Sequence, residues 1–231
     1  MSSEPAFEPK LTLLPSAQQR VFGELGSVSH RFVLYGGTAI TLRLGHRASR
    51  DFDLFSNDHF HPEALERATP LLRGAVRVRS EPDKLVSVVD RDGPVTVSFF
   101  GGLLLSRVAD PAVAVAHRTG GPMADGVLVA SLLDLAATKV KVVQDRAEAK
   151  DYVDVAVLLD EGISLGEVLA AALAVYGPTF NPLLSLKALS YFGDGDLPSL
   201  PKETRLALER AARVTPVASI HLLSRRGGIA P

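Results

Sequence analysis

The chain has 231 residues, with 25 lysines and arginines against 26 aspartates and glutamates, and 46% of its residues are hydrophobic. Its 19 glycines and 15 prolines fall well short of the ~25–30% share that marks low-complexity chains. The composition therefore excludes a collagen-like or disordered chain. A chain of this length can bury a sizeable core, and we expect one large globular unit or two closely packed subdomains.

The absence of cysteine excludes several kinds of chemistry. A disulfide framework, a thiolate nucleophile and a cysteine-based zinc or iron–sulfur site all need thiols, so histidine and carboxylates are the strongest ligands left. No apolar run approaches the ~18–20 residues of a membrane span, and residues 1–10 lack the order of a signal peptide. We therefore expect a cytoplasmic protein with no membrane partner.

Helices and strands alternate in the first half of the chain. Helices are predicted where apolar residues recur at helical spacing, and strands where β-branched and aromatic residues alternate with polar ones. In chain order the predicted elements are a helix at 16–29, a strand at 30–35, a helix at 38–45, a strand at 51–55, a helix at 62–73, and strands at 75–79, 85–89 and 95–100.

Beyond a short final strand at 127–129 the pattern is helical. The predicted helices are 131–146, 149–160, 164–176, about 181–191 and about 202–213. The chain thus divides into an N-terminal α/β domain at 1–129 and a C-terminal helical domain at 130–231.

The stretch from Phe32 to Ser56 carries the first candidate site. A buried strand ends in Gly36, Gly37 and Thr38 at a helix start, where backbone N–H groups can approach a phosphate closely. On the next strand Asp51 and Asp53 alternate with apolar residues, which places both carboxylates on one face. Such a pair can hold Mg²⁺ bridged to substrate phosphates.

Each of these features has a plainer interpretation when taken alone. A glycine pair after a strand is commonly a tight turn, and Asp-x-Asp is often the solvated face of an edge strand. Their order and close spacing favour a functional site. Between them, His46 and Arg47 are candidates to face phosphates, whereas Arg43 and Arg50 fit a solvated helix end and loop.

The helix predicted at 131–146 carries charges in unexpected places. Its apolar side includes Lys139 and Arg146, seven residues apart, while Asp134, Lys141 and Asp145 lie on the opposite side. A charge on a core-facing side is costly unless it is paired or faces a cleft. The alternative is a lysine that extends its ammonium group to solvent at the edge of the apolar side.

The following helix is apolar nearly all round, and Asp151 stands among its apolar residues. We expect it to need a cationic partner, for which Lys139 or Arg146 would serve. The alternative is that Asp151 only complements the helix dipole in the first turn.

These motifs together are similar to a known family. Gly36-Gly37-Thr38 followed by Asp51-Phe52-Asp53 resembles the first signature of the polymerase-β-like nucleotidyltransferase superfamily. More closely, the run GGTAITLRLGHRASRDFDLFS, with DLAATK at 134–139 and KDYVD at 150–154, resembles the AbiEii/AbiGii toxin-like nucleotidyltransferase family over about residues 11–160.

The resemblance implies an α+β fold, with a nucleotidyltransferase-type mixed β-sheet and flanking helices, followed by a C-terminal helical subdomain. It also implies Mg²⁺-dependent transfer of an NMP from an NTP to an acceptor, in some members the 3′ end of tRNA. Family members are toxins of type IV abortive-infection toxin–antitoxin pairs, so a winged-helix antitoxin encoded nearby is an expected partner.

The same resemblance assigns roles to individual residues. Asp51 and Asp53 become metal-binding catalytic residues, and Lys139 and Asp151 match the later catalytic motifs. Gly36, Gly37 and Thr38 become nucleotide-binding residues. Arg47 and Arg146 join them as candidates because of their positions described above, not through the resemblance.

One departure from the superfamily pattern concerns a third carboxylate on a later strand. The strand at 95–100 offers Ser98 at that position. One alternative is therefore a homologue with weak or no catalytic activity that binds a nucleotide or an antitoxin. A second alternative is a nucleotidyltransferase that acts on a small molecule.

Two further sets of residues bear on metal binding and on RNA binding. His59 and His61 have metal-ligand spacing but fit surface capping better than a zinc site. An RNA acceptor would need cations, and the candidates are the basic excess after residue 200, notably Arg205, Arg210 and Arg213, together with Arg118, Lys141 and Arg146.

Overall fold

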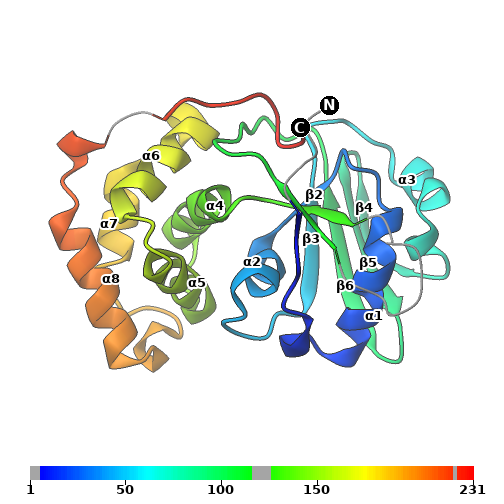
Figure 1. Ribbon diagram of the computed structural model, residues 1–231, viewed down its shortest axis with the longest axis horizontal. Coiled ribbons are helices and arrows are strands. Elements are labelled where there is room, and N and C mark those ends of the chain that lie inside the picture. The colour runs from blue at the N-terminus through cyan, green and yellow to red at the C-terminus, as the bar shows by residue number, and fades with distance from the viewer. Residues whose placement is uncertain (1–5, 116–125, 221–222) are drawn as a thin grey trace. The chain divides into compact units, whose positions relative to one another are not determined.

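The computed structural model describes residues 6–115, 126–220 and 223–231 (Figure 1). The strands are β1 (Ala6–Phe7), β2 (Val33–Tyr35), β3 (Asp51–Phe55), β4 (Val76–Glu81), β5 (Lys84–Asp90), β6 (Pro94–Phe100), β7 (Ala112–Ala114) and β8 (Val127–Val129). The helices are α1 (Ser16–Glu24), α2 (Gly36–Leu44), α3 (Pro62–Ala68), α4 (Leu132–Asp145), α5 (Ala149–Asp160), α6 (Leu165–Tyr176), α7 (Pro182–Ala188) and α8 (Lys202–Val214).

The chain separates into two compact units, each described by itself below. The sheet unit comprises the described residues within 1–105, 110–131 and 227–231, and the helical unit comprises those within 106–109 and 132–226. No pattern in the sequence indicates the two short exchanges, in which 106–109 joins the helices and 227–231 joins the sheet.

The sheet unit is built on one mixed sheet. Its strand order is β1-β7-β8-β2-β3-β6-β5-β4. The pairs β1–β7, β2–β8 and β3–β6 are parallel and the remaining neighbours are antiparallel. Helices α1 and α3 lie on one side of the sheet and α2 on the other (Figure 1). The expected mixed sheet followed by C-terminal helices is confirmed.

Strand alternation produces the core of the sheet unit. Phe52 and Leu54 of β3 are fully buried, and Phe99 of β6 is buried beside them. Phe32 packs edge-to-face on Phe99 with 5.2 Å between ring centroids. Because side chains alternate along a strand, this arrangement sends Asp51 and Asp53 to the opposite face of the sheet.

The helical unit forms around α4 and α6. Helix α6 begins at a capping box in which Ser164 and Glu167 bond reciprocally, and it is buried along most of its length. Helix α4 contacts α5, α6 and α7, and α8 contacts α5 and α7. No helix in the described part of the chain is long and apolar enough to cross a membrane.

Several predicted boundaries were wrong for local reasons. Helix α1 ends at Glu24 and a 3-10 turn, Leu25–Ser27, follows, since glycines at 23 and 26 weaken a longer helix. Helix α3 ends at Ala68 because Pro70 disfavours helical backbone at Thr69, which is extended.

The other differences concern short strands and one helix start. Helix α2 begins at Gly36, two residues earlier than expected, and only Val33–Tyr35 of the segment 30–35 is a strand. Strands β1 and β7 were not predicted, because two or three residues carry no readable alternation.

Candidate functional site

The turn between β2 and α2 brings glycine backbone against a carboxylate. Gly36 has φ +77°, in the region that favours glycine, and a Cβ built there would lie 2.6 Å from Asp53 Oδ2. Any side chain at position 36 would therefore displace the Asp53 carboxylate. This close approach explains why a glycine stands at the start of α2.

Arg47 lies at the same helix N-terminus. A Cβ built on Gly37 would be 2.6 Å from Arg47 Nη2 and 3.1 Å from Ser49 Oγ. Helix α2 has no side-chain cap and no acidic residue in its first turn. The first N–H groups of a helix, the positive end of its dipole and a guanidinium together favour an anion. The structure thus brings Gly37 and Arg47 together, as the phosphate-binding assignment requires.

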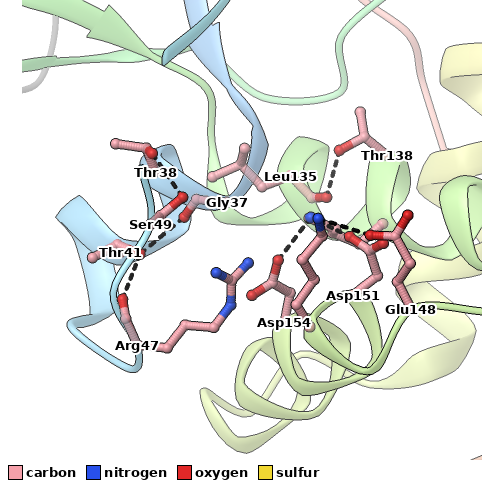
Figure 2. Close-up of polar contacts among 12 residues, drawn as sticks. Gly37, Thr38, Thr41, Arg47, Ser49, Leu135, Thr138, Glu148, Asp151 and Asp154 are labelled. Atoms are coloured by element: carbon pink, nitrogen blue, oxygen red, sulfur yellow. Dashed lines mark hydrogen bonds and ion pairs between the residues drawn. The ribbon is translucent and has the colours of Figure 1, made fainter. Parts of the chain in front are cut away.

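Thr38 has a different position from the one expected of a ligand-facing hydroxyl. It is buried, and its Oγ1 lies 2.5 Å from Asp51 O. The same Oγ1 lies 2.8 Å from Ser49 Oγ (Figure 2). The hydroxyl donates to the carbonyl of Asp51 and accepts from Ser49, so its hydrogen bonds are made within the protein. Thr38 therefore fixes the loop that leads into β3.

Asp51 and Asp53 stand on one face of β3, as the period of two predicted. Asp51 is exposed and Asp53 is half-buried. Mg²⁺ takes oxygen ligands and is usually held by one or two carboxylates plus substrate phosphates, so this pair fits that ion. Within residues 6–115, 126–220 and 223–231 no group of three or more acidic or histidine side chains could hold a metal. His59 Nδ1 lies 2.6 Å from Asp83 Oδ2.

Ser98 lies on the strand next to Asp53. In the parallel β3–β6 pair the register joins Asp53 to Ser98 and Asp51 to Thr96. Paired residues of neighbouring strands project to the same face, and adjacent strands are ~4.8 Å apart. Ser98 is buried. The strand register thus places a serine where a third carboxylate would complete the cluster.

In the helical unit, Lys139 is held between two buried carboxylates. Its Nζ lies 2.7 Å from Asp151 Oδ1 and 2.7 Å from Asp154 Oδ2. Both aspartate side chains are 0% exposed, and that of Lys139 is 7% exposed. Figure 2 shows the two aspartates converging on this point. The predicted need of Asp151 for a cationic partner is met.

Arg146 completes this network from outside. Its Nε donates to Asp151 Oδ2 over 2.7 Å, while the side chain remains 46% exposed. Burial alone would raise the pKa of Asp151, but the hydrogen bond from Arg146 and the charge of Lys139 outweigh it and hold the pKa below its usual range. Asp151 is therefore ionised at neutral pH, with each carboxylate oxygen engaged by a different cation.

Asp154 is the member of this network that the sequence reasoning missed. It follows Asp151 by three residues on α5, and residues at that spacing share one side of a helix. A second carboxylate in a nearly all-apolar helix was the available signal, because a buried charge needs a partner.

The comparisons with known proteins bear on both groups of residues. A family model described as nucleotidyl transferase AbiEii toxin, type IV toxin–antitoxin system, matches residues 22–216. The chain belongs to this family. It is thus a member of the AbiEii nucleotidyltransferase toxins, and the match covers both the β2–β3 motif and the helices that carry Lys139 and Asp151.

Two solved structures are similar to this chain at low sequence identity. MenT4, a nucleotidyltransferase toxin from Mycobacterium tuberculosis H37Rv, is 16% identical with a TM-score of 0.59, covering 87% of this chain and 83% of that one. A putative nucleotidyltransferase from H. pylori is 18% identical with a TM-score of 0.48, covering 85% and 90%. No curated protein sequence matches.

Two charged residues of this AbiEii chain have surroundings that differ from those predicted. Asp134, expected on the polar side of its helix, is buried and accepts hydrogen bonds from the backbone nitrogens of Val108 and Ala109 at 2.8 and 3.2 Å. These bonds tie segment 106–109 to the start of α4. The carboxylate is buried because backbone donors satisfy it.

Arg43 is the second case, since it is not a solvated helix end. Its Nε donates to Ala130 O at 2.8 Å and its Nη2 to Val129 O at 3.0 Å. Its guanidinium lies 4.5 Å from the Phe7 ring centroid, and burial lowers the pKa of Arg43 to about 10. Arg43 therefore links α2 to the end of β8.

The candidate RNA-binding cations have different surroundings. On α8, Arg210 and Arg213 are exposed and Arg205 is half-buried. Lys141 pairs with Asp145 at 2.6 Å, and Arg146 is part of the Asp151 network. Arg118 lies outside the described residues.

Proposed function

We propose that this toxin transfers a nucleotidyl group from an NTP to a hydroxyl of an RNA acceptor, with the 3′ end of tRNA as the expected acceptor, and that Mg²⁺ is its cofactor. The observation that carries the proposal is the Gly36–Asp53 contact. It places a carboxylate beside the uncapped, arginine-flanked N-terminus of a helix. A metal-bound triphosphate needs both an anion site and a carboxylate at close range.

In this proposal the sheet unit binds the donor. The N–H groups of Gly36 and Gly37 and the guanidinium of Arg47 bind the triphosphate, while Thr38 maintains the loop that carries Asp51. Asp51 and Asp53 hold Mg²⁺. The bound ion would neutralise phosphate charge and polarise the reacting phosphate. The acceptor oxygen forms a bond to the α-phosphorus as the bond to the bridging oxygen breaks, pyrophosphate departs with that electron pair, and the hydroxyl proton is released to water.

The helical unit contributes the second group of residues. Lys139 neutralises charge that develops on the phosphates in the transition state. Both oxygens of Asp151 are engaged by cations, which favours a role in orienting Lys139 over direct contact with the acceptor. Asp154 has the same positioning role.

The decisive experiment incubates the purified chain with Mg²⁺, each labelled NTP in turn, and total tRNA. We expect one or more NTPs to label RNA, and no label with Asp53→Asn or in EDTA. Labelling of no RNA by any NTP, with folded protein, would contradict the proposal. An adjacent gene for a small winged-helix protein would support an antitoxin partner.

A second candidate is a nucleotide-binding or antitoxin-binding homologue with little or no transferase activity. The register that joins Asp53 to Ser98 favours it, since the cluster then has two carboxylates rather than three. NTP binding without transfer to RNA or small molecules would support this candidate. Transfer to a small molecule alone would show that the acceptor is a small molecule and not RNA.

A further inference from the structure

The helical unit contains a pocket that the ion-pair network does not fill. The pocket has a volume of about 390 Å³ and is bordered by the C-terminal end of α4, by α5 and α7, and by the segment after α7. This volume lies in the ~300–1,000 Å³ range of small-ligand sites. Its lining includes Arg146, Tyr152, Lys187, Tyr191 and Asp194.

Arg146 links the pocket to the candidate catalytic residues. It lines the pocket and also donates to Asp151 Oδ2, whose other oxygen contacts Lys139. A ligand in the pocket would therefore lie one side chain away from the Lys139–Asp151 pair. A molecule bound there is positioned to take part in the reaction that this pair serves.

The aromatic residues give the pocket a flat apolar surface. Tyr191 is a large side chain that is 57% exposed, and Leu184 beside it is 51% exposed. Tyr152 is buried and packs edge-to-face on Phe192 at 6.1 Å between ring centroids. An exposed tyrosine ring at the border of a pocket is a surface on which a nucleobase can stack.

The polar groups select among planar ligands. Tyr152 lines the pocket, and a tyrosine hydroxyl can donate a hydrogen bond. Burial, followed by the negative charges of Asp151 and Asp194, raises the pKa of Tyr152. Asp194 is exposed, lines the same pocket and supplies acceptor oxygens. A donor beside an acceptor matches the edge of a base that presents an amino group next to a ring nitrogen.

We propose that this pocket binds a nucleobase with an exocyclic amino group, such as adenine or cytosine, with its ring against Tyr191 and its polar edge toward Tyr152 and Asp194. Lys187, exposed in the last turn of α7, then meets an adjoining phosphate. The proposal rests on the proposed function for the origin of the base. Either the donor NTP or the 3′ end of the acceptor RNA supplies the same chemistry.

The test measures equilibrium binding to the full chain without relying on turnover. One arm uses fluorescent single-stranded RNA oligonucleotides that end in A, C or U, and the other uses the four NTPs with Mg²⁺. We expect the parent protein to prefer A or C over U in one arm. If Tyr191→Ala loses affinity for the oligonucleotides, the pocket binds the acceptor. If it loses affinity for the NTPs, the pocket binds the donor.

Variants separate stacking from polar recognition. Tyr191→Ala should weaken binding about 5- to 100-fold, the range expected for one lost base–aromatic stack, whereas Tyr191→Phe should retain it. Tyr152→Phe should reduce the preference for A or C over U. Lys187→Ala should reduce the dependence of RNA or NTP affinity on salt.

Leu183→Ala is the matched control. Leu183 is 60% exposed on the same helix α7 but does not line the pocket, so its truncation should leave binding unchanged. Melting curves check that all variants are folded, and Tyr191 is exposed enough for truncation to leave the core intact.

Failure of this proposal differs from failure of the proposed function. If the parent transfers a nucleotide and Tyr191→Ala binds both ligands as the parent does, the pocket is not a base site while the function stands. If the parent transfers nothing but Tyr191→Ala loses binding, the pocket stands and the function fails. A parent that binds neither the NTPs nor the oligonucleotides overturns the pocket.

Discussion

Asp53 and Ser98 are Cα partners in the parallel β3–β6 pair, so a carboxylate and a buried hydroxyl stand side by side on one face of the sheet. Neighbouring strands in such a pair are ~4.8 Å apart, which is close enough for two side chains to share one ion. The strand register therefore makes Ser98 the position at which the proposed third metal ligand can be tested.

Ser98→Asp should maintain or raise nucleotidyl transfer. A carboxylate buried beside Asp53 repels it, so the variant should melt at a lower temperature in EDTA and recover when Mg²⁺ is added. Melting temperature with and without Mg²⁺ and transfer of labelled NMP are measured on one preparation. Ser98→Asn, of similar size but uncharged, is the control and should show no Mg²⁺-dependent recovery. A large loss of transfer in folded Ser98→Asp would show that position 98 has been misassigned.

Asp51→Asn and Asp53→Asn should each reduce transfer by at least about 100-fold, comparable to the loss of one preorganised electrostatic group. Neither should lower the melting temperature, because each change removes repulsion between two carboxylates on one face. Asp58→Asn is the control: it is an exposed carboxylate of the same segment and should behave as the parent does. Parental turnover by Asp53→Asn would remove this pair from the site.

Lys139→Met should abolish transfer and also destabilise the fold. From the sequence alone, removal of a poorly solvated charge predicts retained or raised stability. The structure reverses that expectation, because the ammonium group neutralises two carboxylates that are 0% exposed. Breaking a buried pair typically lowers the free energy of unfolding by ~3–5 kcal/mol. Each kcal/mol lowers the melting temperature by roughly 2–4 °C for a chain of this size.

A double-mutant cycle tests whether Asp154 acts through Lys139. Asp154→Asn and Lys139→Met should each destabilise the chain, and the double variant should lose less stability than the sum, since the second change then removes an already unpaired group. If the two effects simply add, the contact between Lys139 and Asp154 does not contribute to stability. Asp160→Asn, an exposed carboxylate at the end of the same helix, is the control.

Acid stability should depend on Asp151. Its pKa is held below the usual range in the folded chain, so the folded state binds fewer protons than the unfolded state. This contribution to stability is complete above the unfolded value of about 4 and is lost as pH falls through the folded pKa. Urea unfolding from about pH 7 down to pH 3 should show a shallower acid decline for Asp151→Asn than for the parent. Equal slopes would contradict the assignment.

Much of this molecule follows from periodicity, and the exceptions share a physical cause. Helix α5 and strand β3 were predicted residue for residue, because long or strongly patterned segments depend on their own residues. Strands β1 and β7 exist through their neighbours, and the positions of Asp134 and Arg43 depend on backbone groups that are distant in sequence. The contact of Lys139 with Asp151 was among the predicted pairings, whereas that with Asp154 was missed although a second carboxylate in a nearly all-apolar helix also needs a partner.

Replacing Arg205, Arg210 and Arg213 by alanine tests whether α8 contacts RNA. Arg210 and Arg213 are exposed, and the contact between Arg213 and Glu209 is 3.8 Å long, too weak to hold the side chain. If these arginines meet an RNA backbone, the triple variant should bind RNA more weakly, and its log affinity should depend less on log salt, by about 0.7–0.9 per lost phosphate contact. NTP binding should not change, because a free nucleotide is too small to contact arginines spread along the helix. Changing Lys202, exposed on the same helix, to alanine gives the effect of a single charge. A triple variant with the parent's RNA affinity and salt slope would show that these arginines are only a solvated face, and the RNA-binding surface would then have to lie on other cations of the chain.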